Sequence, residues 1–65
     1  MKLPNGAILI DSKKVEKHLS IVLCKLESSY HPFVTWVYNH SFDGCVHGHY
    51  FSSIKNAAKD FTERN

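Results

Sequence analysis

Two segments dense in β-branched and aromatic residues, FVTWVYN (33–39) and CVHGHYF (45–51), restrict the fold more strongly than any other part of the chain. The residues between them, HSFDG, end in Asp43 and Gly44, and an Asp-Gly pair between two such segments is a strong turn signal. We therefore predict a β-hairpin with a loop of about five residues.

The hairpin register follows from pairing Asn39 with Cys45 across the loop. The further strand pairs are then Tyr38–Val46, Trp36–Gly48 and Val34–Tyr50. This register is chemically sensible, because an indole ring can lie over the space that a glycine leaves in a neighbouring strand. Since side chains alternate along a strand, one face carries Val34, Trp36, Tyr38, Val46 and Tyr50.

The C-terminal segment SSIKNAAKDFTERN has the spacing of an amphipathic helix. Its apolar residues Ile54, Ala57, Ala58 and Phe61 fall at positions i, i+3, i+4 and i+7. Ser52 or Ser53 is a natural N-cap. We predict a helix that packs on the more aromatic face of the hairpin, where its small alanines permit a close approach to bulky rings.

Residues 12–27 fit two secondary structures. Helical spacing relates Val15, Leu19, Val22, Leu23 and Leu26, whereas Leu19, Ile21 and Leu23 alternate with their neighbours as in a strand. We favour a strand over about residues 19–27, preceded by a short helical or irregular segment, because a lone hairpin is only marginally stable. GAILI (6–10) is a candidate for a further strand at the sheet edge.

These elements predict a single domain, residues 1–65, of the α+β class. The expected architecture is a small antiparallel sheet of three or four strands with a C-terminal α-helix packed on one face. A chain of 7.5 kDa buries only about 60 % of its surface on folding. So little scaffold disfavours a deep catalytic cleft, and we expect a non-enzymatic protein with no catalytic residues and no cofactor.

The cellular environment is inferred from the cysteines and from the N-terminus. MKLPNGAILID contains only four consecutive apolar residues, too few for the hydrophobic region of a secretory signal. No apolar run approaches the length of a membrane span. We therefore expect a cytoplasmic protein in which Cys24 and Cys45 are free thiols.

The second face of the predicted hairpin is half apolar and half polar, and the expected sheet leaves it open. Exposed apolar surface of this kind usually marks an interaction site. The predicted partner-binding residues are Phe33, Thr35, Val37, His47, His49 and Phe51. The same open face would serve a homodimer.

The histidines of CVHGHYF also raise the question of a metal site. His47 and His49 point the same way from a strand and would chelate one ion, with Cys45 nearby as a sulfur donor. A structural zinc site needs four ligands, and the remaining candidates (His31, His40 and Cys24) have no spacing that brings them to this strand. We interpret the histidines as contact residues and predict no metal site. Five histidines would also permit a pH-responsive interface.

The charge distribution sets the order of the two possible partner classes. The formal net charge is only +2, and neither strand of the hairpin carries a lysine or arginine. A sheet that binds nucleic acid needs cations to meet phosphate groups. We therefore expect a protein partner, with a nucleic-acid-binding module that uses the sheet face as the alternative.

Three strings in the second half, HPFVTWVYN, DGCVHGHYF and SSIKNAAKDFTER, resemble short proteins of bacteriophages and mobile elements. The resemblance runs from His31 to Arg64 and implies an inhibitor that binds a host protein complex, such as a defence nuclease, and blocks it sterically. Anti-CRISPR proteins are one such class. The strings are also loosely similar to the end of AP2-type and integrase arm-binding domains, which carry Arg and Lys on strands where this chain has none.

Overall fold

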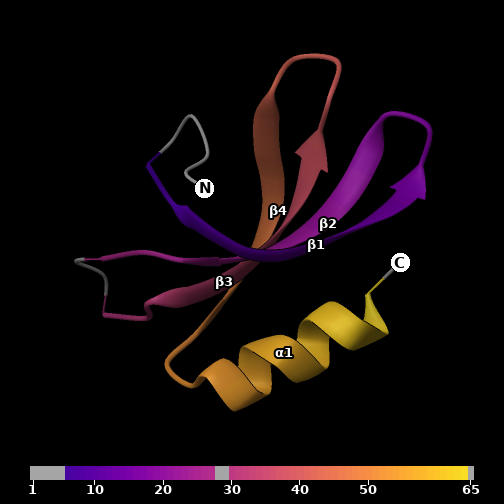
Figure 1. Ribbon diagram of the computed structural model, residues 1–65. Helices are drawn as coiled ribbons and strands as arrows, with labels where there is room; N and C mark the ends of the chain where they lie inside the picture. The colour runs from indigo at the N-terminus through magenta and orange to yellow at the C-terminus, as the bar shows by residue number, and fades with distance from the viewer. Residues whose placement is uncertain (1–5, 28–29, 65) are drawn as a thin grey trace.

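A four-stranded antiparallel sheet followed by one helix makes up the computed structural model, which describes residues 6–27 and 30–64. The strands β1 (Ile8–Glu16), β2 (Leu19–Lys25), β3 (Phe33–Asn39) and β4 (Gly44–Phe51) are neighbours in chain order. Helix α1 (Ile54–Glu63) lies across one face of the curved sheet (Figure 1). The predicted α+β fold with a C-terminal helix on one face is confirmed.

The β3–β4 hairpin forms as predicted, but its register changes in the middle. Val34 pairs with Tyr50, as expected, whereas Tyr38 pairs with Cys45 and not with Val46. The cause is a bulge between Thr35 and Val37, where β4 contains one additional residue. The bulge moves Val46 to the face of its partner Val37 and moves Cys45 to the opposite face.

Two strands joined by a turn at Lys17 and His18 occupy residues 8–25, and the helical or irregular segment expected before residue 19 is wrong. Strand β1 covers that segment together with the predicted edge strand, and β2 confirms the strand expected from residue 19. Register shifts occur in β1 between Leu9 and Asp11 and between Lys14 and Glu16. These bulges break the two-residue alternation on which recognition of a strand depends.

Local capping fixes both ends of α1. The Ser53 Oγ accepts a hydrogen bond from the backbone N–H of Lys55 at 3.2 Å, which confirms the predicted N-cap. At the other end the backbone N–H of Arg64 donates to the carbonyl of Asp60 at 2.9 Å. Just beyond this end, the Arg64 side chain contacts Thr35 of β3.

The face on which α1 packs is the opposite of the predicted one. Ala57 and Phe61 pack against Ile21 and Leu23, and the surrounding partly buried residues are Val15, Phe33, Val37, Phe51 and Ala58. The prediction placed the helix on the Trp36 face because that face is more aromatic. That choice was argued from the two hairpin strands alone, whereas Ile21 and Leu23 of β2 supply much of the apolar surface that the helix covers.

The Trp36 face forms a second buried cluster without the helix. Ala7, Val22, Cys24, Val34 and Trp36 are buried there, with Leu9, Leu26, Tyr38 and Cys45 packed around them. The sheet curves strongly, so that its two hairpins bend away from the helix (Figure 1). Ala7, which precedes β1, is itself a buried member of this cluster.

The tips of the two hairpins meet at one end of the sheet. The backbone N–H of His40, after β3, donates to the carbonyl of His18, between β1 and β2, at 2.8 Å. The Ser20 hydroxyl and the His40 Nε2 are also hydrogen-bonded, at 2.8 Å. These contacts hold together the end of the sheet that lies beyond the helix.

Gly48 generates a prediction about stability, since a Cβ built there would lie 2.6 Å from Trp36 Nε1. We expect Gly48→Ala to lower the free energy of unfolding in urea by about 1–3 kcal/mol, as overpacking does, and to shift the emission of the single tryptophan. Gly6, at φ +88° with open space around it, is the control. Gly6→Ala should cost about 1 kcal/mol through its backbone and leave the emission unchanged. A Gly48→Ala protein as stable as wild type would contradict the predicted clash.

Candidate functional site

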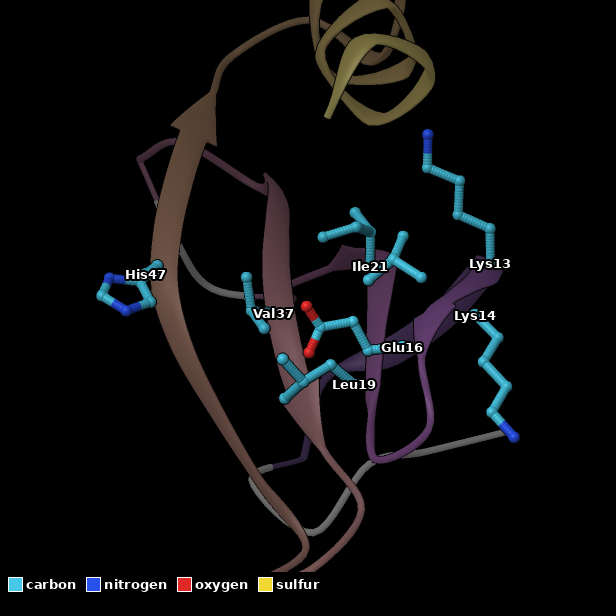
Figure 2. Close-up of a pocket in the computed structure, with 8 residues that line it drawn as sticks. Lys13, Lys14, Glu16, Leu19, Ile21, Val37 and His47 are labelled. Atoms are coloured by element: carbon cyan, nitrogen blue, oxygen red, sulfur yellow. The ribbon is translucent and has the colours of Figure 1, made fainter. Parts of the chain in front are cut away.

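An open groove of about 720 Å³ lies on the helix-bearing face, between the helix and the tip of the β1–β2 hairpin. Its floor is apolar, and charged residues stand along its rim (Figure 2). The lining residues are Lys13, Lys14, Val15, Glu16, Leu19, Ile21, Val37 and His47. Strands β1 to β4 all contribute, so the whole curved sheet shapes the groove.

The groove exists because α1 covers only part of this face. The buried side chains Ala57 and Phe61 lie over Ile21 and Leu23 of β2. Towards the hairpin tips, Leu19 and Val37 remain only half-buried. An apolar floor that the protein's own helix leaves uncovered is available to another molecule.

Apolar surface continues from the groove floor to the tip of the β3–β4 hairpin. Val46 pairs with Val37, on the same face, and is 39 % exposed. Phe42, 60 % exposed, places its ring over the Cα of Gly44, on the side to which Val46 also points. The apolar floor thus extends to the open edge of β4.

The charged residues of the rim are not equivalent. Lys13 Nζ donates to the carbonyl of Thr62 at 3.0 Å and lies 5.3 Å from the centre of the Phe61 ring. Lys14 is directed away from the groove, whereas the Glu16 side chain extends across the floor towards Leu19 and Val37 (Figure 2). Of these three charges, the Glu16 carboxylate is the one presented over the apolar floor.

His47 adopts an uncommon backbone conformation, with φ +53°. It sits in the β4 bulge, and its carbonyl accepts a hydrogen bond from Arg64 Nη2 at 2.9 Å. Histidine is among the residues that tolerate the left-handed region best. Its imidazole is exposed and points outward from β4, away from the other labelled residues of the groove (Figure 2).

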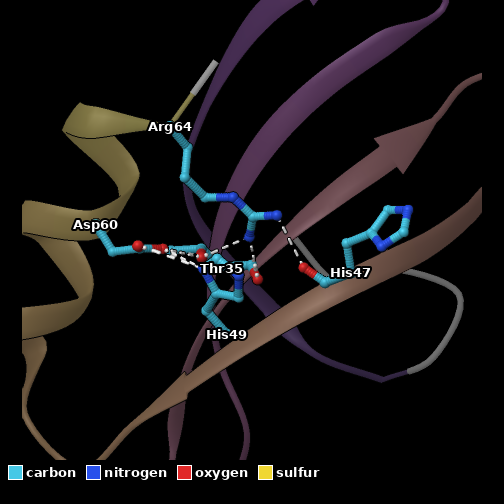
Figure 3. Close-up of polar contacts among 5 residues, drawn as sticks. All are labelled: Thr35, His47, His49, Asp60 and Arg64. Atoms are coloured by element: carbon cyan, nitrogen blue, oxygen red, sulfur yellow. Dashed lines mark hydrogen bonds and ion pairs between the residues drawn. The ribbon is translucent and has the colours of Figure 1, made fainter.

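A polar network ties the last turn of the helix to the sheet (Figure 3). The buried Thr35 hydroxyl donates to Asp60 Oδ2 at 2.6 Å. His49 Nδ1 lies 3.1 Å from the same oxygen and 3.3 Å from Oδ1. Arg64 Nη1 donates to both the carbonyl and the hydroxyl of Thr35, at 3.1 and 3.0 Å.

The network also determines the ionisation of Asp60. Partial burial alone would raise the pKa of this carboxyl group. The hydrogen bonds from Thr35 and His49, and the charges of His49 and Arg64, outweigh that effect and hold the pKa of Asp60 below its ordinary value of 3.8. Thr35 is fully buried, and its contacts with Asp60 and Arg64 position the end of the helix on the sheet.

The six residues predicted to contact a partner do not form one exposed face. Thr35 is fully buried, and Phe33 and Phe51 pack against the cluster under the helix. His49 is half exposed, with its ring held by Asp60. Of the six predicted residues, only Val37 and His47 line the groove. The expectation that this side of the hairpin lies open was wrong because it is the side on which the helix packs.

The groove residues on β1 were missed by sequence reasoning. Lys13, Lys14, Val15 and Glu16 were treated as part of a helical or irregular segment, since the bulges conceal their alternation. The strand expected over about residues 19–27 was correct, but its register against β3 was not predicted. The structure pairs Leu19 with Asn39 and Ile21 with Val37.

The two cysteines do not join the histidines. Cys24 is buried and Cys45 packs on the Trp36 face, and both are free thiols, as predicted. Burial is the main cause that raises the pKa of Cys24 to about 12, with a smaller contribution from the nearby Cys45. Burial also raises the pKa of Cys45, and the negative charge of Asp43 adds to this effect. Both groups are therefore poor nucleophiles at neutral pH. Within residues 6–27 and 30–64, no group of three or more His, Cys, Asp or Glu side chains is placed to hold a metal ion.

The lowered pKa of Asp60 predicts a pH dependence of stability. The ionised carboxylate stabilises the fold above the pKa of the unfolded group, near 3.8, and this stabilisation is lost as the pH falls through the lower folded pKa. Asp60→Asn should therefore lower the free energy of unfolding at neutral pH by more than it does in acid. Urea titrations across the acid range measure this difference. Thr62→Ala, a non-titrating change on the same helix, should give a pH-independent effect, and a pH-independent effect of Asp60→Asn would contradict the role of its charge.

Comparison with protein-family models, curated proteins and solved structures gave no match. Among the described residues, no helix is long and apolar enough to cross a membrane. The functional assignment therefore depends on the groove and on the side chains around it.

Proposed function

We propose that the chain is a non-enzymatic protein-binding module whose docking site is the groove and the adjoining edge of β4. The observation that carries the proposal is the continuity of apolar surface from Leu19 and Val37 to the exposed Val46 and Phe42. Protein interfaces combine an apolar centre with a polar rim, and a few central side chains supply most of the binding energy. The groove floor and its charged rim have this arrangement.

The charges around the groove favour a protein over a nucleic acid as the partner. Lys13 is engaged with Thr62 and Phe61, and Lys14 is directed away from the floor. Glu16 places a negative charge where a phosphate group would have to approach. Nucleic-acid surfaces require several cations that converge on the backbone phosphates.

The more specific part of the proposal concerns the biological role. The resemblance to short phage proteins supports an inhibitor that occupies the surface of a host defence complex and blocks it sterically. The groove is compatible with this role because occlusion requires a rigid apolar contact surface and no chemistry. The β1–β2 and β3–β4 tips, joined through His40, supply that rigidity.

Capture from a bacterial lysate on immobilised protein tests the docking site. Proteins that the wild-type bait captures should be retained at least about tenfold less by the Val46→Lys bait, because a buried unpaired charge at an interface is strongly unfavourable. Tyr50→Lys is the matched control, since Tyr50 is on the same strand, is 52 % exposed and pairs with Val34 of the other cluster.

The control should retain the same partners at wild-type levels, with unchanged circular dichroism for both variants. Loss of capture by Tyr50→Lys together with full capture by Val46→Lys would place the interface on the other face. The absence of any partner specific to wild type would contradict the protein-binding proposal itself.

A further inference from the structure

The chemistry of the groove also indicates which partner side chain it accepts. Leu19, Ile21 and Val37 form an apolar floor, and the carboxylate of Glu16 extends over it (Figure 2). Among the described residues, Glu16 forms no ion pair; the ion pair that these residues do contain, His49–Asp60, lies outside the groove lining. The groove therefore combines an apolar surface with one unpaired negative charge.

A count of charges alone would suggest an acidic partner, since Lys13 and Lys14 also line the groove. Their positions argue otherwise. The Lys13 ammonium is already bonded to the Thr62 carbonyl and lies near the Phe61 ring, and the Lys14 ammonium points to solvent on the far side of β1. His47 likewise directs its ring outward from β4. A bound group would meet the Glu16 carboxylate first.

Lysine and arginine match this combination of surfaces. Their aliphatic stems pack along apolar side chains while their charged ends reach a polar partner. Arginine is also enriched at the energetic centres of protein interfaces. A glutamate or aspartate would meet the like charge of Glu16, while the Lys13 ammonium is held at the helix by the Thr62 carbonyl.

We propose that the groove binds a lysine or arginine side chain of the partner protein, with its stem on Leu19 and Val37 and its charge paired with Glu16. This inference rests on the proposed protein-binding function and names the chemistry of the contact. The bound side chain would be oriented as well as attracted, because its aliphatic stem and its charged end contact different residues of the groove.

Capped pentapeptides with a central lysine, arginine, norleucine or glutamate between two valines test the proposal without knowledge of the partner. Titrated into ¹⁵N-labelled protein, the lysine and arginine peptides should shift the amides of Glu16, Leu19 and Val37. They should bind about two- to fivefold more tightly than the norleucine peptide, the range expected for one exposed charge pair. The glutamate peptide should bind most weakly.

Two variants that each remove one charge locate the charge that is responsible. Glu16→Gln should remove the advantage of the lysine peptide over the norleucine peptide. Lys14→Gln, which changes a charge that lines the groove but points away from it, should leave that advantage unchanged or increase it. Added salt should weaken the lysine peptide more than the norleucine peptide.

Three results would overturn the inference: tighter binding of the glutamate peptide, an advantage for lysine that survives Glu16→Gln, or no shift at the groove with the lysine peptide at millimolar concentration. Equal binding of the norleucine and lysine peptides at the groove would reject the basic side chain while leaving the docking site intact. Unaltered capture by Val46→Lys in the lysate experiment would instead reject the docking site, whatever the peptides do.

Discussion

The hydrogen bond from the Thr35 hydroxyl to the Asp60 carboxylate holds α1 in place on the sheet. The position of the helix in turn decides which part of that face stays exposed. Once the helix covers Thr35, the hydroxyl loses contact with water, and an unpaired buried hydroxyl costs about 1–3 kcal/mol. Asp60 replaces that water, and Arg64 bonds the same threonine from the end of the helix. The last helical turn is therefore fixed over the middle of β3.

Fixing the helix in this place has two consequences for the rest of the face. Phe61 and Ala57 complete a cluster with Ile21 and Leu23, so this half of the sheet is closed. The half nearer the hairpin tips receives no helical residue and retains an apolar floor. The groove thus occupies the part of this face that α1, fixed at its end by these polar contacts, does not cover.

Much of the fold could be predicted from local patterns. The Asp43-Gly44 turn, the strand composition and the i, i+3, i+4, i+7 stripe of α1 are signals contained in neighbouring residues, and the hairpin and helix formed as they indicate. The fit of Trp36 over Gly48 also followed from sequence. By contrast, the bulges in β1 and at His47 remove the alternation that a strand normally shows.

The choice of face for the helix depended on long-range contacts. Thr35 reads as a surface residue in isolation, and only its pairing with Asp60, 25 residues away, makes its burial favourable. Trp36 reads as a partner for the helix, yet the curvature of the sheet buries it beside Val22 and Val34. For the same reason the groove could not be inferred, because it combines β1, β2, β3 and β4 residues whose juxtaposition requires the complete sheet.

The position of α1 is tested most directly by nuclear Overhauser contacts between the Phe61 ring protons and the methyl groups of β2. The structure predicts strong contacts from Phe61 to Ile21 and Leu23. Strong contacts from Phe61 to Val22, together with contacts to the Trp36 indole, would place the helix on the other face and contradict the account of both the fold and the groove.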